Sequence, residues 1–145
     1  MKPTNSMKTV FESRSINESF ARGVSAAFCA QLDPTIDELC DIKTAVSEAV
    51  TNCIVHGYPD SVGKIYISAA IYGDRRLVIK VKDNGRGIAD VSQAMEPLFT
   101  TGNSDERSGL GFSVMQSVMD KVSVRSKAGG PTTVTLEKKL SSKGE

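Results

Sequence analysis

Apolar residues recur along the chain with two different spacings, which predict strands in some stretches and helices in others. Alternating apolar and polar residues over 65–71 and 77–81 predict two half-buried strands. Gly73 and Asp74 lie between these strands and predict a hairpin turn. Shorter apolar runs predict three further strands, at residues 9–13, 122–126 and 132–137.

Three stretches have helical spacing instead. Ser15 with Glu18, and Thr35 with Glu38, have the spacing of capping boxes and predict two helix starts. The apolar face expected for the first helix is Phe20, Val24, Ala27 and Phe28. The second helix, which we expect to end at Gly57, should bury Ile36, Leu39, Val46, Ala49, Val50 and Cys53. A third helix over residues 111–120 should bury Phe112, Met115, Val118 and Met119.

The order of these elements predicts the fold class. Strands and helices do not alternate strictly, so we expect an α+β two-layer sandwich, with helices on one face of a mixed, largely antiparallel sheet. A chain of 145 residues should form a single domain, residues 1–145, around one core. Residues 90–109 show little periodicity beyond a helical turn near 92–95, and a loop of this length predicts a lid. Residues 140–145 should form a frayed tail.

Charge and cysteine content mainly exclude functions. The 18 basic and 17 acidic residues nearly cancel, so we expect no direct binding of nucleic acid and no membrane partner. The N-terminal residues lack the apolar run of a signal peptide, which favours a cytoplasmic protein. Cys29, Cys40 and Cys53 should be small, buried, reduced thiols. A single histidine, His56, excludes a histidine-based metal cluster.

The first motif that carries chemistry lies in the second predicted helix. Glu48 and Asn52 are four residues apart and therefore project from the same side. An amide oxygen suits Mg²⁺ that also binds phosphate and water, so Asn52 is a candidate metal ligand. The Glu48 carboxylate could accept a proton from a hydroxyl that attacks a γ-phosphate. A lone helical glutamate is more often a solvated charge, but an asparagine inside a helix is unfavourable and favours the functional interpretation.

The second motif, Asp83-Asn84-Gly85-Arg86-Gly87, follows an apolar strand. Asp83 could accept a hydrogen bond from the exocyclic amine of adenine, whereas guanine presents an oxygen at that position and would be rejected. Gly85 and Gly87 would let the backbone approach a purine closely, or adopt positive φ. A hydrogen-bonded turn after a strand is the alternative interpretation of Asp83, and Arg86 should be solvent-exposed.

The third motif places glycines at a predicted helix start. Gly109, Leu110 and Gly111 would offer backbone N–H groups and the positive end of the helix dipole to phosphate. Arg107 could reach the terminal phosphates and stabilise charge during transfer, although a loop arginine is more often a surface residue. The three motifs together predict a site for ATP and Mg²⁺ that has no P-loop, because G-x-x-x-x-G-K-[ST] occurs nowhere.

Hydroxyl side chains and the histidine are weaker candidates. Thr100 and Thr101 lie in the predicted lid. Thr133 lies in the last predicted strand, where threonine usually reflects β propensity. His56 follows Asn52 by four residues and could contact phosphate, but a histidine that binds carbonyls at a helix end is an equally good interpretation.

As a set, the motifs resemble the N, G1 and G2 boxes of the GHKL superfamily, which includes gyrase, histidine kinases and a heat-shock chaperone. Within it, the chain is similar to the anti-sigma factor serine kinases of sporulating bacilli. The passages that carry this resemblance are residues 18–22, 47–52, 97–101 and 106–112. It runs from the first predicted strand to about Lys139. Pro131 departs from it, because the family usually has glycine before the threonine pair.

The resemblance implies a GHKL fold that binds ATP and Mg²⁺ under a lid. It also implies a homodimer that binds and inhibits a sporulation sigma factor of RNA polymerase, and that phosphorylates a serine on an anti-anti-sigma protein. Glu48 carries over as the catalytic base and Asn52 as the Mg²⁺ ligand. Asp83 carries over as the adenine reader, Arg107 as the γ-phosphate arginine and Arg22 as a partner contact.

Three other functions fit parts of the sequence. A related serine kinase that controls a general-stress sigma factor would carry nearly the same motifs, but the residues around Arg22 and the short length favour the sporulation type. A histidine kinase catalytic domain is disfavoured, because no helix with a phosphoacceptor histidine precedes the site. A module that only sequesters its partner in a nucleotide-dependent way would not need Glu48 beside Asn52.

Overall fold

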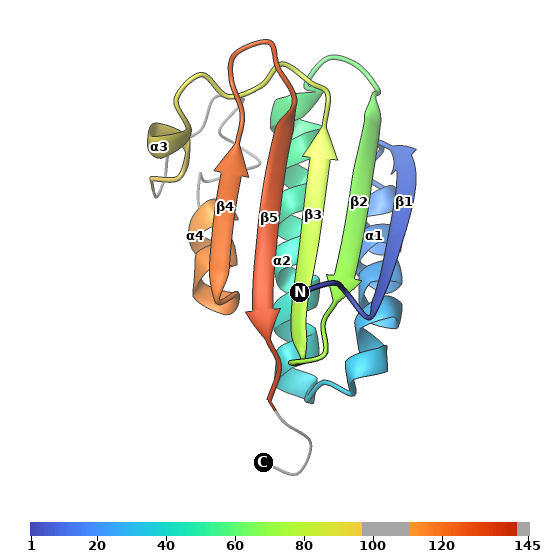
Figure 1. Cartoon of the computed structure of the whole chain (residues 1–145). Coiled ribbons are helices and arrows are strands. Elements are labelled where there is room, and N and C mark those ends of the chain that lie inside the picture. Colours follow the sequence, from blue (N-terminus) through green and yellow to red (C-terminus); the bar gives the residue numbers. More distant parts are fainter. Residues whose placement is uncertain (97–110, 142–145) are drawn as a thin grey trace.

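The computed structural model describes residues 1–96 and 111–141. Figure 1 shows two layers, a five-stranded sheet and a layer of helices that covers one of its faces. The strands are β1 (Asn5–Glu12), β2 (Lys64–Ile71), β3 (Arg76–Asp83), β4 (Lys121–Arg125) and β5 (Thr132–Lys139). The helices are α1 (Asn17–Cys29), α2 (Ile36–Asn52), the short α3 (Val91–Ala94) and α4 (Gly111–Val118). A 3₁₀ turn follows α1 (Ala30–Leu32), and a π-helical turn follows α2 (Cys53–Gly57).

The sheet has the strand order β1-β2-β3-β5-β4, and every one of these neighbouring pairs is antiparallel. The predicted α+β sandwich is therefore confirmed, with a sheet that is antiparallel throughout the described strands. The predicted hairpin between β2 and β3 is also present. Its loop ends at Arg75, which has a φ of 69° and donates its backbone N–H to the Tyr72 carbonyl.

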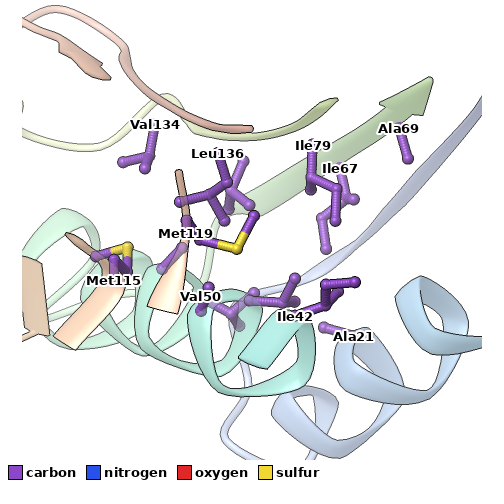
Figure 2. Close-up of a cluster of buried hydrophobic side chains, with 14 of the residues drawn as sticks. Ala21, Ile42, Val50, Ile67, Ala69, Ile79, Met115, Met119, Val134 and Leu136 are labelled. Carbon is purple, nitrogen blue, oxygen red and sulfur yellow. The ribbon is translucent and has the colours of Figure 1, made fainter. Parts of the chain in front are cut away.

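The core lies between the sheet and α2. Alternate residues of β2, β3 and β5 are buried on the helix side of the sheet, as the strand periodicity predicts. In Figure 2, Ile67, Ile79 and Leu136 of the sheet face Ile42 and Val50 of α2. Burial of these apolar side chains holds α2 in the centre of the helical layer, and α2 is the helix that carries Glu48 and Asn52.

One predicted capping box is confirmed and the other is wrong. At the start of α2, Thr35 Oγ1 accepts from Glu38 N–H at 3.1 Å, and the Glu38 carboxylate accepts from Thr35 N–H at 2.9 Å. α1 begins without a side-chain cap. The Glu18 carboxylate, which was expected to close that box, instead accepts from Ser47 Oγ of α2 at 2.6 Å. A tertiary hydrogen bond has therefore replaced the local one.

The helix faces differ from the prediction at a few positions. α1 buries Ala21, Ser25, Phe28 and Cys29, whereas Ala27 and Phe20 are exposed. Ile36 at the start of α2 is 80% exposed, and Ile42 is buried instead. Ala27 lies six positions after the buried Ala21, and Ile36 lies six positions before the buried Ile42. Six positions turn a side chain by about 120° around a helix, so Ala27 and Ile36 both point away from these buried residues. Cys40 is also exposed, contrary to prediction, because it lies on the opposite side of α2 from Ile42.

The first residues of the predicted loop and the first residues of the predicted tail make ordered contacts. The helical turn expected near 92–95 is α3, which Asp90 caps by accepting from Gln93 N–H at 3.0 Å. Residues 97–110 lie outside the described part of the chain. The frayed tail is wrong for its first two residues: Leu140 is buried, and Ser141 N–H donates to Glu38 at 2.8 Å. None of the helices in the described residues is long and apolar enough to cross a membrane.

Candidate nucleotide site

Glu48 and Asn52 lie on the last two turns of α2, where the helix meets the start of α4. A Cβ atom added to Gly111 would lie 3.2 Å from the Asn52 side-chain amide atoms and 3.3 Å from Glu48 Oε2. The first residue of α4 therefore lies against both side chains. The structure brings the first motif and the end of the third motif together, and Gly111 permits this close approach because it has no side chain.

The donor set at this point fits a magnesium ion that also binds phosphate. The described residues contain no group of three or more histidine, cysteine or acidic side chains that could hold a metal alone. Asn52 and Glu48 offer one amide and one carboxylate on the same side of α2. Mg²⁺ usually keeps several waters and binds proteins through one or two side chains plus substrate phosphates. The residues present are therefore sufficient only if the nucleotide supplies the remaining oxygens.

The π-helical turn after Asn52 connects this group to Asp83. The turn is marked by the hydrogen bond from Tyr58 N–H to the Cys53 carbonyl, at 2.9 Å. It places the Cys53 thiol beside the Asp83 carboxylate, whose pKa the thiol lowers. It also places Gly57 so close that an added Cβ would lie 2.9 Å from Asp83 Cγ. Helical structure ends at Gly57 as predicted, although its last turn is wider than an α-turn, a feature frequent at functional sites.

Asp83 ends β3 as a buried carboxylate, with only 3% of its surface exposed. Its Oδ1 accepts from Gly85 N–H at 2.9 Å, so the hydrogen-bonded turn expected as an alternative is present. Burial raises the pKa of Asp83, and the hydrogen bonds from Gly85 and Cys53 oppose this shift only in part. Burial and the charge of Asp83 in turn raise the pKa of the Cys53 thiol. Asp83 is thus a fixed, poorly solvated hydrogen-bond acceptor.

The two glycines after Asp83 pack against other parts of the backbone. A Cβ at Gly85 would lie 2.1 Å from the Gly57 carbonyl oxygen. Gly87 has a φ of 77°, and a Cβ there would lie 1.9 Å from the Lys127 carbonyl oxygen. The predicted positive φ is present at Gly87. At Gly85 the group that approaches closely is the Gly57 carbonyl of the protein itself. Arg86 is exposed, yet its Nε donates to the His56 carbonyl at 3.0 Å.

The strand register points to Thr132, rather than Thr133, as the threonine beside Asp83. Thr132 pairs directly with Asp83 and is buried, whereas Thr133 pairs with Lys82 and lies on the other face of the sheet. The Thr132 hydroxyl is 2.6 Å from Ser126 Oγ, which accepts from Ile88 N–H at 2.8 Å. Alternation along β5 could have identified Thr132, because it shares a face with Val134 and Leu136.

Six predicted site residues remain. Five of them lie outside the described residues, namely Arg107, Gly109, Leu110, Thr100 and Thr101. Arg22 lies on α1, 3.4 Å from Glu18 in an ion pair across one helical turn. Its side chain is 40% exposed.

Arg22 and Glu48 line the same groove. This groove lies between α1 and α2, has a volume of about 510 Å³, and is also lined by Ser19, Gly23, Cys40, Lys43, Thr44 and Ser47. The candidate base and the candidate partner contact therefore share one surface. The sequence did not indicate this surface, because its walls come from two helices whose packing is set by the core.

Comparison with known proteins identifies the family. Residues 11–138 match the profile of the histidine kinase-like ATPase domain. This chain belongs to that family. The anti-sigma F factor of Thermoanaerobacter sp. (strain X514) is 56% identical over 142 residues, which cover 98% of this chain and 99% of that protein. The anti-sigma F factor of Heyndrickxia coagulans is 50% identical over 140 residues, which cover 96% of this chain and 95% of that protein.

Solved structures support the same fold at lower identity. The RsbU and RsbW domains of Rv1364c from Mycobacterium tuberculosis superpose with a TM-score of 0.68 at 23% identity, covering 95% of this chain and 32% of that chain. The blue-light activated histidine kinase EL346 of Erythrobacter litoralis superposes with a TM-score of 0.60 at 21% identity, covering 83% of this chain and 41% of that chain. The predicted resemblance to the anti-sigma F branch of this ATPase family is confirmed.

Proposed function

We propose that this chain is an anti-sigma factor that is also an ATP-dependent serine protein kinase. In this proposal it binds and inhibits a sporulation sigma factor and inactivates an anti-anti-sigma protein by phosphorylating one of its serines. The observation that carries the kinase assignment is the contact of Glu48 and Asn52 with the start of α4. The full-length similarity to anti-sigma F factors supports the sigma factor as the partner. The proposal includes a cytoplasmic homodimer.

Each part of the site has a defined task in this proposal. Asp83 accepts a hydrogen bond from the adenine amine, and Thr132 borders it from β5. Asn52 holds the Mg²⁺ ion, which neutralises charge on the phosphates. Arg107, Gly109 and Leu110, with the hydroxyls of Thr100 and Thr101, are proposed to bind the phosphates from the segment before α4.

The proposed transfer uses Glu48 as the base. The serine oxygen of the acceptor forms a bond to the γ-phosphorus while its proton passes to a Glu48 carboxylate oxygen. The bond between the γ-phosphorus and the oxygen that bridges to the β-phosphate breaks, and ADP leaves with that electron pair. Glu48 is half-buried and lines the groove, so a protein hydroxyl can reach it from outside.

The test combines phosphotransfer and partner capture. The purified chain is incubated with Mg²⁺, γ-labelled ATP and a sporulation-type anti-anti-sigma protein, and the products are analysed for phosphoserine. An acceptor with its target serine changed to alanine is the control. We expect phosphoserine only on the unaltered acceptor, and nucleotide-dependent retention of a sporulation sigma factor in pull-downs. Retention of the sigma factor without any phosphoserine would indicate a module that only sequesters the sigma factor, and would contradict the proposed kinase function.

A further inference from the structure

The groove between α1 and α2 is a polar channel that reaches the candidate base. α1 and α2 run antiparallel here, because Glu18 in the first turn of α1 accepts from Ser47 and Thr51 near the end of α2. The α2 wall extends from Cys40 to Glu48, about 12 Å along the helix. That length matches three to four residues of an extended peptide.

Away from the catalytic end, the two charged side chains that line this channel are positive, and one of them, Arg22, also forms an ion pair with Glu18 at 3.4 Å. Lys43 is exposed on the α2 wall, and Arg22 lies on the α1 wall. The walls also carry the hydroxyls of Ser19, Thr44 and Ser47, and none of the described residues that line the groove has a large apolar side chain. Such a surface suits a polar segment with acidic side chains rather than an apolar helix.

The position of the channel suits an acceptor rather than a nucleotide. The start of α4 contacts the Glu48 carboxylate, and in the function proposed above the phosphates lie beside this helix start. In phosphoryl transfer the attacking and leaving oxygens lie roughly in line, on opposite sides of the phosphorus. The acceptor must therefore approach Glu48 from a direction that the nucleotide does not occupy.

We propose that this channel binds the serine-bearing segment of the protein substrate, and that Lys43 and Arg22 bind acidic side chains next to the acceptor serine. The proposal rests on the serine kinase function proposed above. It adds a substrate class, an acidic segment around the serine. It also adds Lys43 as a specificity-determining residue and the α1–α2 channel as its docking site.

Charge reversal of Lys43 tests the electrostatic part. Lys43→Glu should raise the KM for the acceptor protein by about tenfold, with kcat within about twofold of the parent and unchanged ATP affinity. Lys80→Glu is the matched control, because Lys80 is also exposed but lies on β3, away from the helices. An unchanged acceptor KM in Lys43→Glu would overturn the proposal.

A pair of substitutions at Gly23 tests the steric part. A Cβ added to Gly23 would meet no atom within 4 Å, so larger residues can be introduced without disturbing the fold. Gly23→Leu projects its side chain into the channel and should raise the acceptor KM about tenfold, whereas Gly23→Ala should stay close to the parent. Equal KM values in the two variants would show that the acceptor does not enter the channel.

The cysteines allow the channel to be probed directly. Cys40 lines it and is exposed, whereas Cys29 and Cys53 are buried. A fluorescent maleimide should therefore react at Cys40, and the acceptor protein should slow this reaction. Labelled protein should still bind ATP but transfer phosphate poorly, and a Cys40→Ser variant treated with the same maleimide should be unaffected. Equal labelling rates with and without the acceptor would contradict the proposal.

These measurements separate failure of the docking proposal from failure of the kinase proposal. If the parent chain transfers no phosphate to the acceptor, the kinase function is wrong and the docking proposal falls with it. If the parent transfers phosphate and the Lys43, Gly23 and Cys40 tests show no effect, the kinase function stands and the docking proposal alone is wrong.

Discussion

The two ends of the candidate site differ in how firmly they are built. At the Asp83 end, a buried carboxylate is fixed by a backbone N–H, a thiol and two glycines that touch neighbouring backbone. At the Glu48 end, the carboxylate is half-buried and opens into a 510 Å³ groove with long, exposed side chains such as Lys43 on its wall. One end has almost no room for rearrangement, and the other is accessible to a macromolecule.

In the proposed function, this difference corresponds to two kinds of recognition. Selection of a nucleobase depends on a buried polar group, because a wrong nucleobase leaves that group without a hydrogen-bond partner at a cost in free energy. Such selection requires rigid surroundings. Transfer of phosphate to a protein requires a catalytic base that remains accessible and a surface that can bind the protein. Substitutions at the Asp83 end should therefore act on stability and nucleotide choice, and those at the Glu48 end on turnover.

The largest effect is expected at Glu48. Glu48→Gln keeps the shape of the side chain but removes the base, so phosphotransfer should fall by about 10²–10⁴ in kcat. ATP affinity, measured by titration in the presence of Mg²⁺, should stay nearly that of the parent, and thermal stability should change little. A variant that transfers phosphate at the parental rate would show that Glu48 is not the base.

The next largest effect tests the rigidity of the Asp83 end. Gly87→Ala should lower the free energy of unfolding by about 2–4 kcal/mol, because it combines positive φ with a backbone collision at Lys127. Gly129→Ala is the matched control: Gly129 has a φ of 75°, but an added Cβ meets nothing, so a loss of about 1 kcal/mol is expected. Urea denaturation measures both values. Equal losses would mean that close packing around Gly87 contributes nothing.

Asp83→Asn should change both nucleotide choice and the pH dependence of stability. Because the folded pKa of Asp83 is raised, the native state holds its proton more tightly than the unfolded chain. In the parent, the contribution of the Asp83 proton to the free energy of unfolding should therefore fall as the pH rises above about 3.9, the ordinary pKa of an aspartic acid. The variant should lack that fall and should discriminate ATP from GTP about tenfold less. Parallel pH profiles and unchanged GTP rejection would place base recognition elsewhere.

The smallest effect distinguishes two adjacent threonines. Thr132→Val removes a hydroxyl from the hydrogen-bonded cluster beside Asp83 and should weaken ATP binding by about fivefold to tenfold. Thr133→Val, on the other face of the sheet, should have no measurable effect on ATP affinity. Isothermal titration of both variants under one set of conditions makes the comparison, and the reverse order would contradict the register argument.

The sequence predicted most of the strands and helices, and the helix face that two candidate site residues share, because those features depend on local patterns. Alternation identified β2 and β3, and the spacing of Glu48 and Asn52 identified one face of α2. The errors occurred where a contact distant in sequence decided the outcome. Glu18 is held by Ser47 rather than by its own helix start, and Leu140 is buried although it follows the last strand. The choice between Thr132 and Thr133 likewise required the pairing of β5 with β3.

The strand order also determines when the nucleotide site can form during synthesis. β5 is the last strand of the described chain, yet it lies inside the sheet between β3 and β4 (Figure 1). Until residues 132–139 leave the ribosome, β3 has an unpaired edge and Asp83 lacks its neighbour Thr132. A nascent chain that already contains Glu48, Asn52 and Asp83 therefore still lacks one side of the proposed base pocket. In the proposed function, nucleotide binding should therefore appear only after residues 132–139 have been synthesised, and any chain truncated before β5 should bind no nucleotide.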